Sequence, residues 1–232
     1  IRPEQVQSMD NENMKDIICQ ILVRTGALRF GAFTLPTGRF TCYHMDLAIL
    51  PAFPEIFDIV TGIYETTVKK EVGADRFERI GCPLKVGIPY GPVLALRTMK
   101  PFLYIRKGAD THGRERKVEG LLLLGERVLI VDDITTTGKS ILEATDMVRC
   151  EGGVVNDAVV LIDREEGGPR ALEAAGVKLH AFVNITEIAK TLFGMGSIDN
   201  RQFEEIMKQK TRARAVLPRS QSQDVEQLSR RF

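Results

Sequence analysis

Residues 128–140 have the sequence Val-Leu-Ile-Val-Asp-Asp-Ile-Thr-Thr-Thr-Gly-Lys-Ser, and this segment decides the fold class. Its first four residues are apolar, which is typical of a strand buried on both faces, and they lead directly into two carboxylates. Residues 141–148 then have helical spacing, so hydroxyls and backbone N–H groups gather at a helix N-terminus. The pattern predicts a phosphate-binding turn whose neighbouring acids hold hydroxyls or a divalent cation, as a sugar phosphate with Mg²⁺ would provide.

Two other interpretations of this segment have to be weighed. Gly138, Lys139 and Ser140 match the end of a nucleoside-triphosphate loop, but that motif requires a glycine where this chain has Asp133. A purely structural interpretation is a buried strand whose acids cap the following helix. Neither interpretation accounts for the complete segment.

The complete segment resembles the phosphoribosyl-pyrophosphate (PRPP) signature of type I phosphoribosyltransferases. The resemblance implies that Asp132 and Asp133 hold the ribose hydroxyls, with Asp133 also a catalytic residue and Mg²⁺ bound through PRPP near both acids. It further implies a 5-phosphate site made of Thr135, Thr136, Thr137, Gly138, Lys139 and Ser140.

Composition limits the class of protein. A chain of 232 residues with 44% hydrophobic residues can bury one good core with a small appended lobe. The net charge of +1 provides no general attraction to nucleic acid or membranes, and no apolar run approaches the ~18–20 residues of a spanning helix. Four scattered cysteines fit neither a zinc site nor a disulfide framework. We therefore expect a cytoplasmic protein with reduced thiols.

The first fifty residues are expected to form a lead, a helix and a small hood. Residues 1–12 are interpreted as a disordered lead or an expression remnant. Helical spacing predicts a helix over residues 13–25, and short strands are predicted over 28–34 and 40–46. A plain hairpin is the alternative to a hood over residues 13–50.

The order of residues 26–46 resembles the N-terminal region of orotate phosphoribosyltransferases, with Arg29, Thr41, Tyr43 and Asp46 at matching places. In that family the region closes over the pyrimidine, which implies a base-binding role for Arg29.

Residues 51–196 are expected to form the phosphoribosyltransferase core. A helix is predicted over 54–72, strands over 101–105, 154–162 and 178–185, and a helix over 186–192. Alternating strands and helices predict an α/β fold with a central, mostly parallel sheet flanked by helices. The resemblance implies the type I phosphoribosyltransferase fold.

Two loops carry candidate cations. Residues 80–89 combine glycines and prolines around Lys85, and they lie where the resembled family binds pyrophosphate, with Val86 as an apparent insertion. The alternative is a plain strand-to-helix connection. Residues 106–120 are highly charged and resemble the family's catalytic loop, which closes over the active site of the neighbouring subunit. The resemblance implies a homodimer with shared sites, PRPP contacts from Arg106, Lys107 and His112, and catalytic roles for Lys107 and His112.

This second loop departs from the family pattern. Gly108 and Asp110 stand where the family has glutamate and lysine, and each unit of charge at ~4 Å is worth about 4 kcal/mol at an effective dielectric of 20. Arg114, Arg116 and Lys117 are the candidate compensating cations. Three interpretations stay open: a working orotate enzyme, a phosphoribosyltransferase for another base, and a regulatory PRPP sensor with little turnover.

Arg164 follows the strand predicted over residues 154–162. Ligands bind at the carboxyl ends of such strands, and a planar guanidinium suits the carboxylate of orotate. The resemblance, which extends over residues 26–192, implies that Arg164, Thr136 and Arg29 orient the base. It implies transfer from PRPP to orotate, giving orotidine 5′-monophosphate and pyrophosphate, in pyrimidine biosynthesis.

Residues 197–232 are expected to form a helix, within 199–210, and a basic disordered tail. We do not expect nucleic-acid binding because no aromatic residues interleave the arginines.

Overall fold

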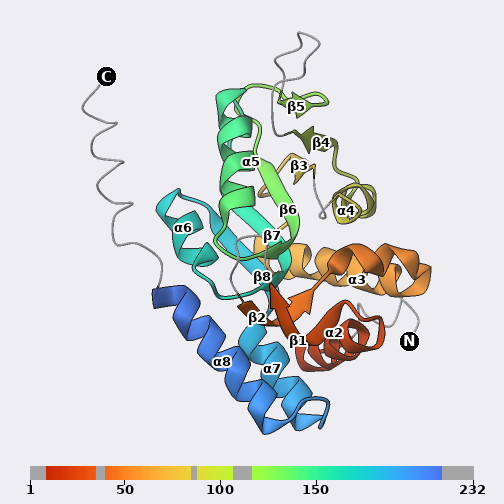
Figure 1. Cartoon of the computed structure of the whole chain (residues 1–232). Coiled ribbons are helices and arrows are strands. Elements are labelled where there is room, and N and C mark those ends of the chain that lie inside the picture. The colour runs from red at the N-terminus through yellow and green to blue at the C-terminus, as the bar shows by residue number, and fades with distance from the viewer. Residues whose placement is uncertain (1–8, 35–39, 85–87, 107–116, 216–232) are drawn as a thin grey trace.

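The structure is a computed structural model that describes residues 9–34, 40–84, 88–106 and 117–215 (Figure 1). Three candidate site residues, Lys85, Lys107 and His112, lie outside these ranges. Asp110, Arg114, Arg116, the predicted basic tail from residue 216 and most of the predicted lead also lie outside them.

A six-stranded sheet forms the centre of the protein. Its strand order is β5-β4-β3-β6-β7-β8, and every neighbouring pair is parallel except β4 and β5, which are antiparallel. The strands are β3 (Arg79–Pro83), β4 (Phe102–Ile105), β5 (Val118–Glu119), β6 (Val128–Thr135), β7 (Asp157–Asp163) and β8 (Lys178–Asn184). The predicted α/β fold with a mostly parallel sheet is confirmed.

Helices cover both faces of this sheet (Figure 1). Alternate residues of β6 show why, because Leu129 and Val131 join one apolar cluster while Val128 and Ile130 join another. The second cluster includes apolar residues of α5 (Lys139–Cys150) and α6 (Gly168–Ala174). The first includes residues of α2 (Asn11–Arg24), α3 (Pro54–Thr67), α4 (Tyr90–Thr98) and α7 (Ile185–Gly194). A 3-10 helix, Leu47–Ala52, precedes α3, and a turn of π-helix, Val68–Val72, follows it.

The predicted hood is present as a separate two-stranded antiparallel sheet of β1 (Leu28–Thr34) and β2 (Phe40–Met45). A long helix, α8 (Asn200–Ala215), packs against β2 and α7. The C-terminal part of the described chain therefore lies beside the N-terminal hood (Figure 1).

Some predicted boundaries were wrong. Helix α2 begins at Asn11, inside the predicted lead, because Asp10 caps it by accepting a hydrogen bond from Asn13 N at 2.8 Å. Strand β7 begins at Asp157 rather than Val154, which forms an isolated bridge with Arg127. The predicted loop over residues 80–89 begins as strand β3, whose five residues are all buried between β4 and β6.

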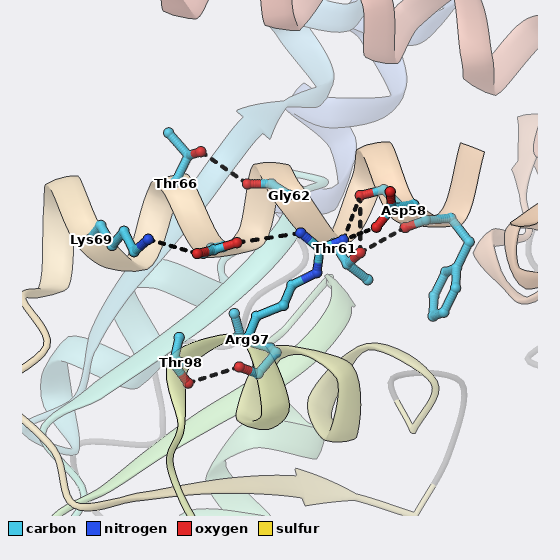
Figure 2. Close-up of polar contacts among 10 residues, drawn as sticks. Asp58, Thr61, Gly62, Thr66, Lys69, Arg97 and Thr98 are labelled. Carbon is cyan, nitrogen blue, oxygen red and sulfur yellow. Dashed lines mark hydrogen bonds and ion pairs between the residues drawn. The ribbon is translucent and has the colours of Figure 1, made fainter. Parts of the chain in front are cut away.

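Polar contacts fix α4 against α3, as Figure 2 shows. Arg97 of α4 forms an ion pair with Asp58, and its Nη1 lies 3.3 Å from Glu65 Oε2. Lys69 Nζ approaches the other oxygen of Glu65 at 2.6 Å. Helix α4 begins at Tyr90, shortly after Lys85 in the sequence. These contacts therefore hold in place the helix that follows Lys85.

In the part of the chain that the structure describes, no helix is long and apolar enough to cross a membrane.

Candidate active site

The turn between β6 and α5 encloses a cavity of about 330 Å³. Gly138 supplies the N-cap of α5 with φ +80°, a left-handed conformation that favours glycine. Strand β6 continues through both acids to Thr135, further than its apolar run predicted, so Asp132 belongs to the strand and also lines the cavity. The lining residues are Asp132, Ile134, Thr135, Thr136, Thr137, Gly138, Lys139, Ser140, Ile141 and Glu143.

Two hydroxyl groups in this cavity lack partners. Thr135 Oγ1 and Ser140 Oγ are buried and form no hydrogen bond with any residue that the structure describes. A buried hydroxyl without a partner costs free energy, so its presence in a polar cavity indicates that a ligand supplies the partner. The N-terminus of α5 favours an anion at the same place. The cavity therefore has unpartnered hydroxyls and a helix N-terminus, groups that suit a phosphate.

The loop after β7 holds the turn in place. Gly168 N donates to Thr136 O at 2.9 Å, and Arg164 N donates to Thr135 O at 3.0 Å. A Cβ atom at Gly168 would lie 2.8 Å from Thr135 Oγ1 and 3.0 Å from Thr136 O, so any larger residue would displace the turn. This close approach requires glycine at position 168.

The acid pair is almost completely buried, with Asp132 and Asp133 only 3% and 5% exposed. Asp133 N donates to Asp132 Oδ1 at 3.0 Å. Burial, followed by the neighbouring charge of Asp132, raises the pKa of Asp133 well above its ordinary value. The pair therefore has acceptor oxygens for sugar hydroxyls. Its negative charge is destabilised by burial, and a cation or the hydroxyls of a diol would stabilise it.

A tyrosine of α3 reaches into the sheet beside this pair. Tyr64 Oη donates to Asp132 O at 2.8 Å and accepts from Leu161 N at 3.1 Å. Strands β6 and β7 pair Asp132 with Val160 and Ile134 with Ile162, so the Tyr64 hydroxyl bridges the two backbones at the level of Asp133. Burial raises the pKa of Tyr64, which keeps the hydroxyl a neutral donor. Sequence reasoning missed Tyr64 because it lies on the apolar face of α3 like any core residue.

Arg164 joins the central sheet to the hood. Its Nε donates to Tyr43 Oη at 3.1 Å, and its guanidinium carbon lies 4.9 Å from the centre of the Tyr43 ring. Its Nη2 lies 2.8 Å from Glu166 Oε1 in an ion pair, yet forms no hydrogen bond with the described residues. Burial raises the pKa of Tyr43 to about 12, although Arg164 opposes the shift, so the phenol stays neutral. A buried guanidinium with donor capacity left suits a carboxylate ligand.

The remaining predicted residues are placed as follows. Thr136 lies in the turn and lines the cavity. Arg29 pairs with His44 across the hood while Phe30 pairs with Tyr43, so strand alternation puts Arg29 on the opposite face of the hood from Tyr43. Arg106 directly follows β4, and its Nε lies 3.8 Å from Glu119 Oε1. The structure thus brings Arg164 to the hood but does not bring Arg29 to the same face.

A parallel sheet with an acid pair and a hydroxyl-rich turn at one strand end, under a separate hood, defines a type I phosphoribosyltransferase. The family described as "Phosphoribosyl transferase domain" matches residues 52–178. The orotate phosphoribosyltransferase of Cenarchaeum symbiosum is 38% identical over 175 residues, which are 75% of this chain and 87% of that relative. The chain therefore belongs to the orotate phosphoribosyltransferase family, whose members are glycosyltransferases.

Solved structures agree with this assignment. The crystal structure of orotate phosphoribosyltransferase from Aeropyrum pernix has a TM-score of 0.69 and 30% identity, covering 78% of this chain and 99% of that chain. The structure of UMP synthase from Leishmania donovani has a TM-score of 0.76 and 26% identity, covering 85% of this chain and 42% of that chain.

Proposed function

We propose that this protein transfers the 5-phosphoribosyl group from PRPP to orotate, producing orotidine 5′-monophosphate and pyrophosphate in pyrimidine biosynthesis. The observation that carries the proposal is the cavity at the β6–α5 turn, where two buried hydroxyls without partners face a helix N-terminus beside the buried acid pair. A ribose 5-phosphate has the oxygens and hydroxyls that these groups require.

In this assignment, Thr135, Thr136, Thr137, Gly138, Lys139 and Ser140 bind the 5-phosphate. Asp132 and Asp133 accept hydrogen bonds from the ribose hydroxyls, and their negative charge stabilises the cationic sugar that forms as the reaction proceeds. A turn made of backbone N–H groups and short hydroxyls binds the substrate in one orientation, which aligns the anomeric carbon with the base.

The reaction breaks the bond between the anomeric carbon and a pyrophosphate oxygen, and the pyrophosphate leaves with the bonding electron pair. A bond then forms from that carbon to a ring nitrogen of orotate, which loses its proton to solvent. The departing polyanion has to meet positive charge, which Lys85, Arg106, Lys107 and His112 would supply, with Lys107 and His112 as catalytic residues. Mg²⁺, when bound through PRPP, would neutralise part of this charge. Among the described residues no cluster of three or more His, Cys, Asp or Glu could hold a metal alone, and oxygen donors from Asp132 and Asp133 fit a metal shared with the substrate.

The base would lie between the sheet and the hood. Arg164, held by Tyr43, presents a guanidinium nitrogen that can donate to the carboxylate of orotate, and Thr136 is within the adjoining turn. Arg29 would reach the base from the other face of the hood only if the hood rearranges when substrate binds.

A homodimer with shared sites is part of the proposal. Segment 107–116 joins β4 and β5 at one edge of the sheet. Nearby elements carry exposed apolar side chains, with Leu96 73%, Met99 84% and Tyr104 42% exposed. Exposed apolar side chains at this edge of the sheet support a subunit interface there. We also propose that the protein is located in the cytoplasm.

The test is pyrophosphate release measured with PRPP, Mg²⁺ and a panel of orotate, uracil and purine bases, together with calorimetry of PRPP binding. Turnover that depends on orotate is the expected result. Turnover with another base alone would show that this base, and not orotate, is the substrate. PRPP binding without any turnover would favour a regulatory PRPP sensor, the interpretation suggested by Gly108 and Asp110. Replacing both Asp132 and Asp133 by Asn should abolish PRPP binding, and unchanged affinity would contradict the site assignment.

A further inference from the structure

Helix α8 lies outside the matched domain of residues 52–178, yet it contacts residues that neighbour each member of the Arg164–Tyr43 pair in the chain. The first contact passes through Glu165, the residue after Arg164. Lys210 Nζ lies 2.8 Å from Glu165 Oε1 and donates to Thr186 Oγ1 at 2.6 Å. The other oxygen of Glu165 accepts from Thr186 N at 3.2 Å and from Thr186 Oγ1.

Glu165 needs this support because of its backbone. Its φ is +55°, in the left-handed region that few residues other than glycine adopt. The side chains of Glu165 and Lys210 are only 14% and 19% exposed, so solvent screens their ion pair weakly. Although burial opposes the shift, the contacts from Lys210 and Thr186 lower the pKa of Glu165 below its ordinary value, so the carboxylate is charged at neutral pH. The contact therefore stabilises the unusual backbone turn from which Arg164 projects.

The second contact passes through the hood. Gln209 Oε1 accepts from Cys42 N at 3.0 Å, and Gln209 Nε2 donates to Thr41 Oγ1 at 2.9 Å. Thr41 Oγ1 in turn donates to Tyr43 O at 2.8 Å. Gln209 thereby fixes Thr41 and Cys42, the two residues directly before Tyr43, and Thr41 extends this contact to the Tyr43 carbonyl.

Adjacent residues of one helix thus hold the two partners of the base-side pair, Lys210 through Glu165 and Gln209 through Thr41. We propose that α8 acts as a clamp that determines affinity for the base, with Lys210 and Gln209 as positioning residues for Arg164 and Tyr43. The inference rests on the proposed base-binding role of Arg164. Neither residue needs to touch the substrate.

The principal variant is Lys210→Met, which keeps the length of the side chain and removes its charge. We expect the KM for orotate to rise roughly 10-fold or more, with kcat changed less and PRPP affinity in calorimetry unchanged, since a hydrogen bond to a charged group is worth about that factor. Lys208→Met is the matched control, because Lys208 is on the same helix, is 64% exposed and lies 3.2 Å from Glu204, away from the clamp. Lys210→Arg should restore most of the orotate affinity.

A second readout does not depend on which base reacts. Exchange of the Arg164 Nε proton, followed by nuclear magnetic resonance and assigned with Arg164→Lys, should accelerate in Lys210→Met and not in Lys208→Met. Faster exchange together with an absence of orotate turnover in the natural protein would overturn the proposed function and leave the clamp standing. Orotate turnover with equal KM and equal exchange in the two variants would overturn the clamp, as would a parallel loss of PRPP and orotate affinity in Lys210→Met.

Discussion

Asp133 shows at the level of one residue how the buried acid pair opposes the stability of the fold. Its carboxyl group is buried beside Asp132, and burial together with that neighbour raises its pKa. In the unfolded chain the same group ionises near its ordinary pKa of about 3.9. As pH rises above that value the unfolded state gains a charge that the folded state resists, so Asp133 destabilises the folded protein at neutral pH.

We therefore expect Asp133→Asn to increase the free energy of unfolding by about 1 kcal/mol at pH 7.5 and by less at pH 5, where Asp133 in the folded protein holds its proton more fully. The amide also donates to Asp132 as a protonated carboxyl group would. Urea unfolding of the protein without ligand measures the change, and Asp146→Asn on the exposed side of α5 is the control. Destabilisation by Asp133→Asn at both pH values would show that the acid pair is structurally required.

At the level of elements, the contacts between α3 and α4 determine how the segment containing Lys85 enters its helix. Arg97 crosses from α4 to Asp58 and to Glu65, whose side chain is only 8% exposed (Figure 2). Periodicity predicted α3 but not α4, because Tyr90–Thr98 is short and has a glycine and a proline in its first turn. Tertiary packing and these ion pairs stabilise a helix that the sequence pattern alone did not predict.

Arg97→Met should lower the free energy of unfolding by about 2 kcal/mol, because it leaves the buried carboxylate of Glu65 without its α4 partner. Lys69→Met removes the other cation near Glu65, but Lys69 is 57% exposed, so its loss should cost under about 1 kcal/mol. Urea unfolding at pH 7.5 compares the two variants. An equal cost for both would mean that the link between the helices contributes nothing beyond the charge on Glu65.

At the level of the whole molecule, β4 and β5, which flank segment 107–116 in the sequence, form one edge of the sheet, and a segment that starts from this edge favours a site completed by a second subunit. A Lys107→Ala subunit paired with an Arg164→Ala subunit contains one site with both lesions and one site with neither. Each variant alone should be nearly inactive, while the verified heterodimer should recover about half of the natural activity per dimer. A heterodimer of two differently tagged Lys107→Ala subunits is the control, and failure of the mixed dimer to exceed it would show that each loop serves its own subunit.

The sequence by itself determined the features that depend on neighbouring residues. Residues 128–140 encode a buried strand, an acid pair and a hydroxyl-rich turn in one continuous segment, so the cavity at the start of α5 was predictable from spacing alone. Helical spacing likewise predicted α2 and α3, and strand signals predicted the two hood strands. The alternation of strands and helices predicted the mostly parallel sheet. Boundaries were less predictable, because the end of β6 and the start of β3 depend on strand partners rather than on local pattern.

Only the tertiary structure decided which distant side chains meet. Tyr64 contacts Leu161 across 97 positions of sequence, and Arg164 contacts Tyr43 across 121. Lys210 likewise contacts Glu165 from α8, a helix that lies outside the residues that resemble the family. Periodicity identifies the face of an element that is buried but not the residue on another element that packs against it, because that choice depends on how the helices and the hood pack together around the sheet. The orientation of Arg164 is therefore a property of the folded chain, whereas the hydroxyl-lined cavity at the β6–α5 turn is a property of one short segment.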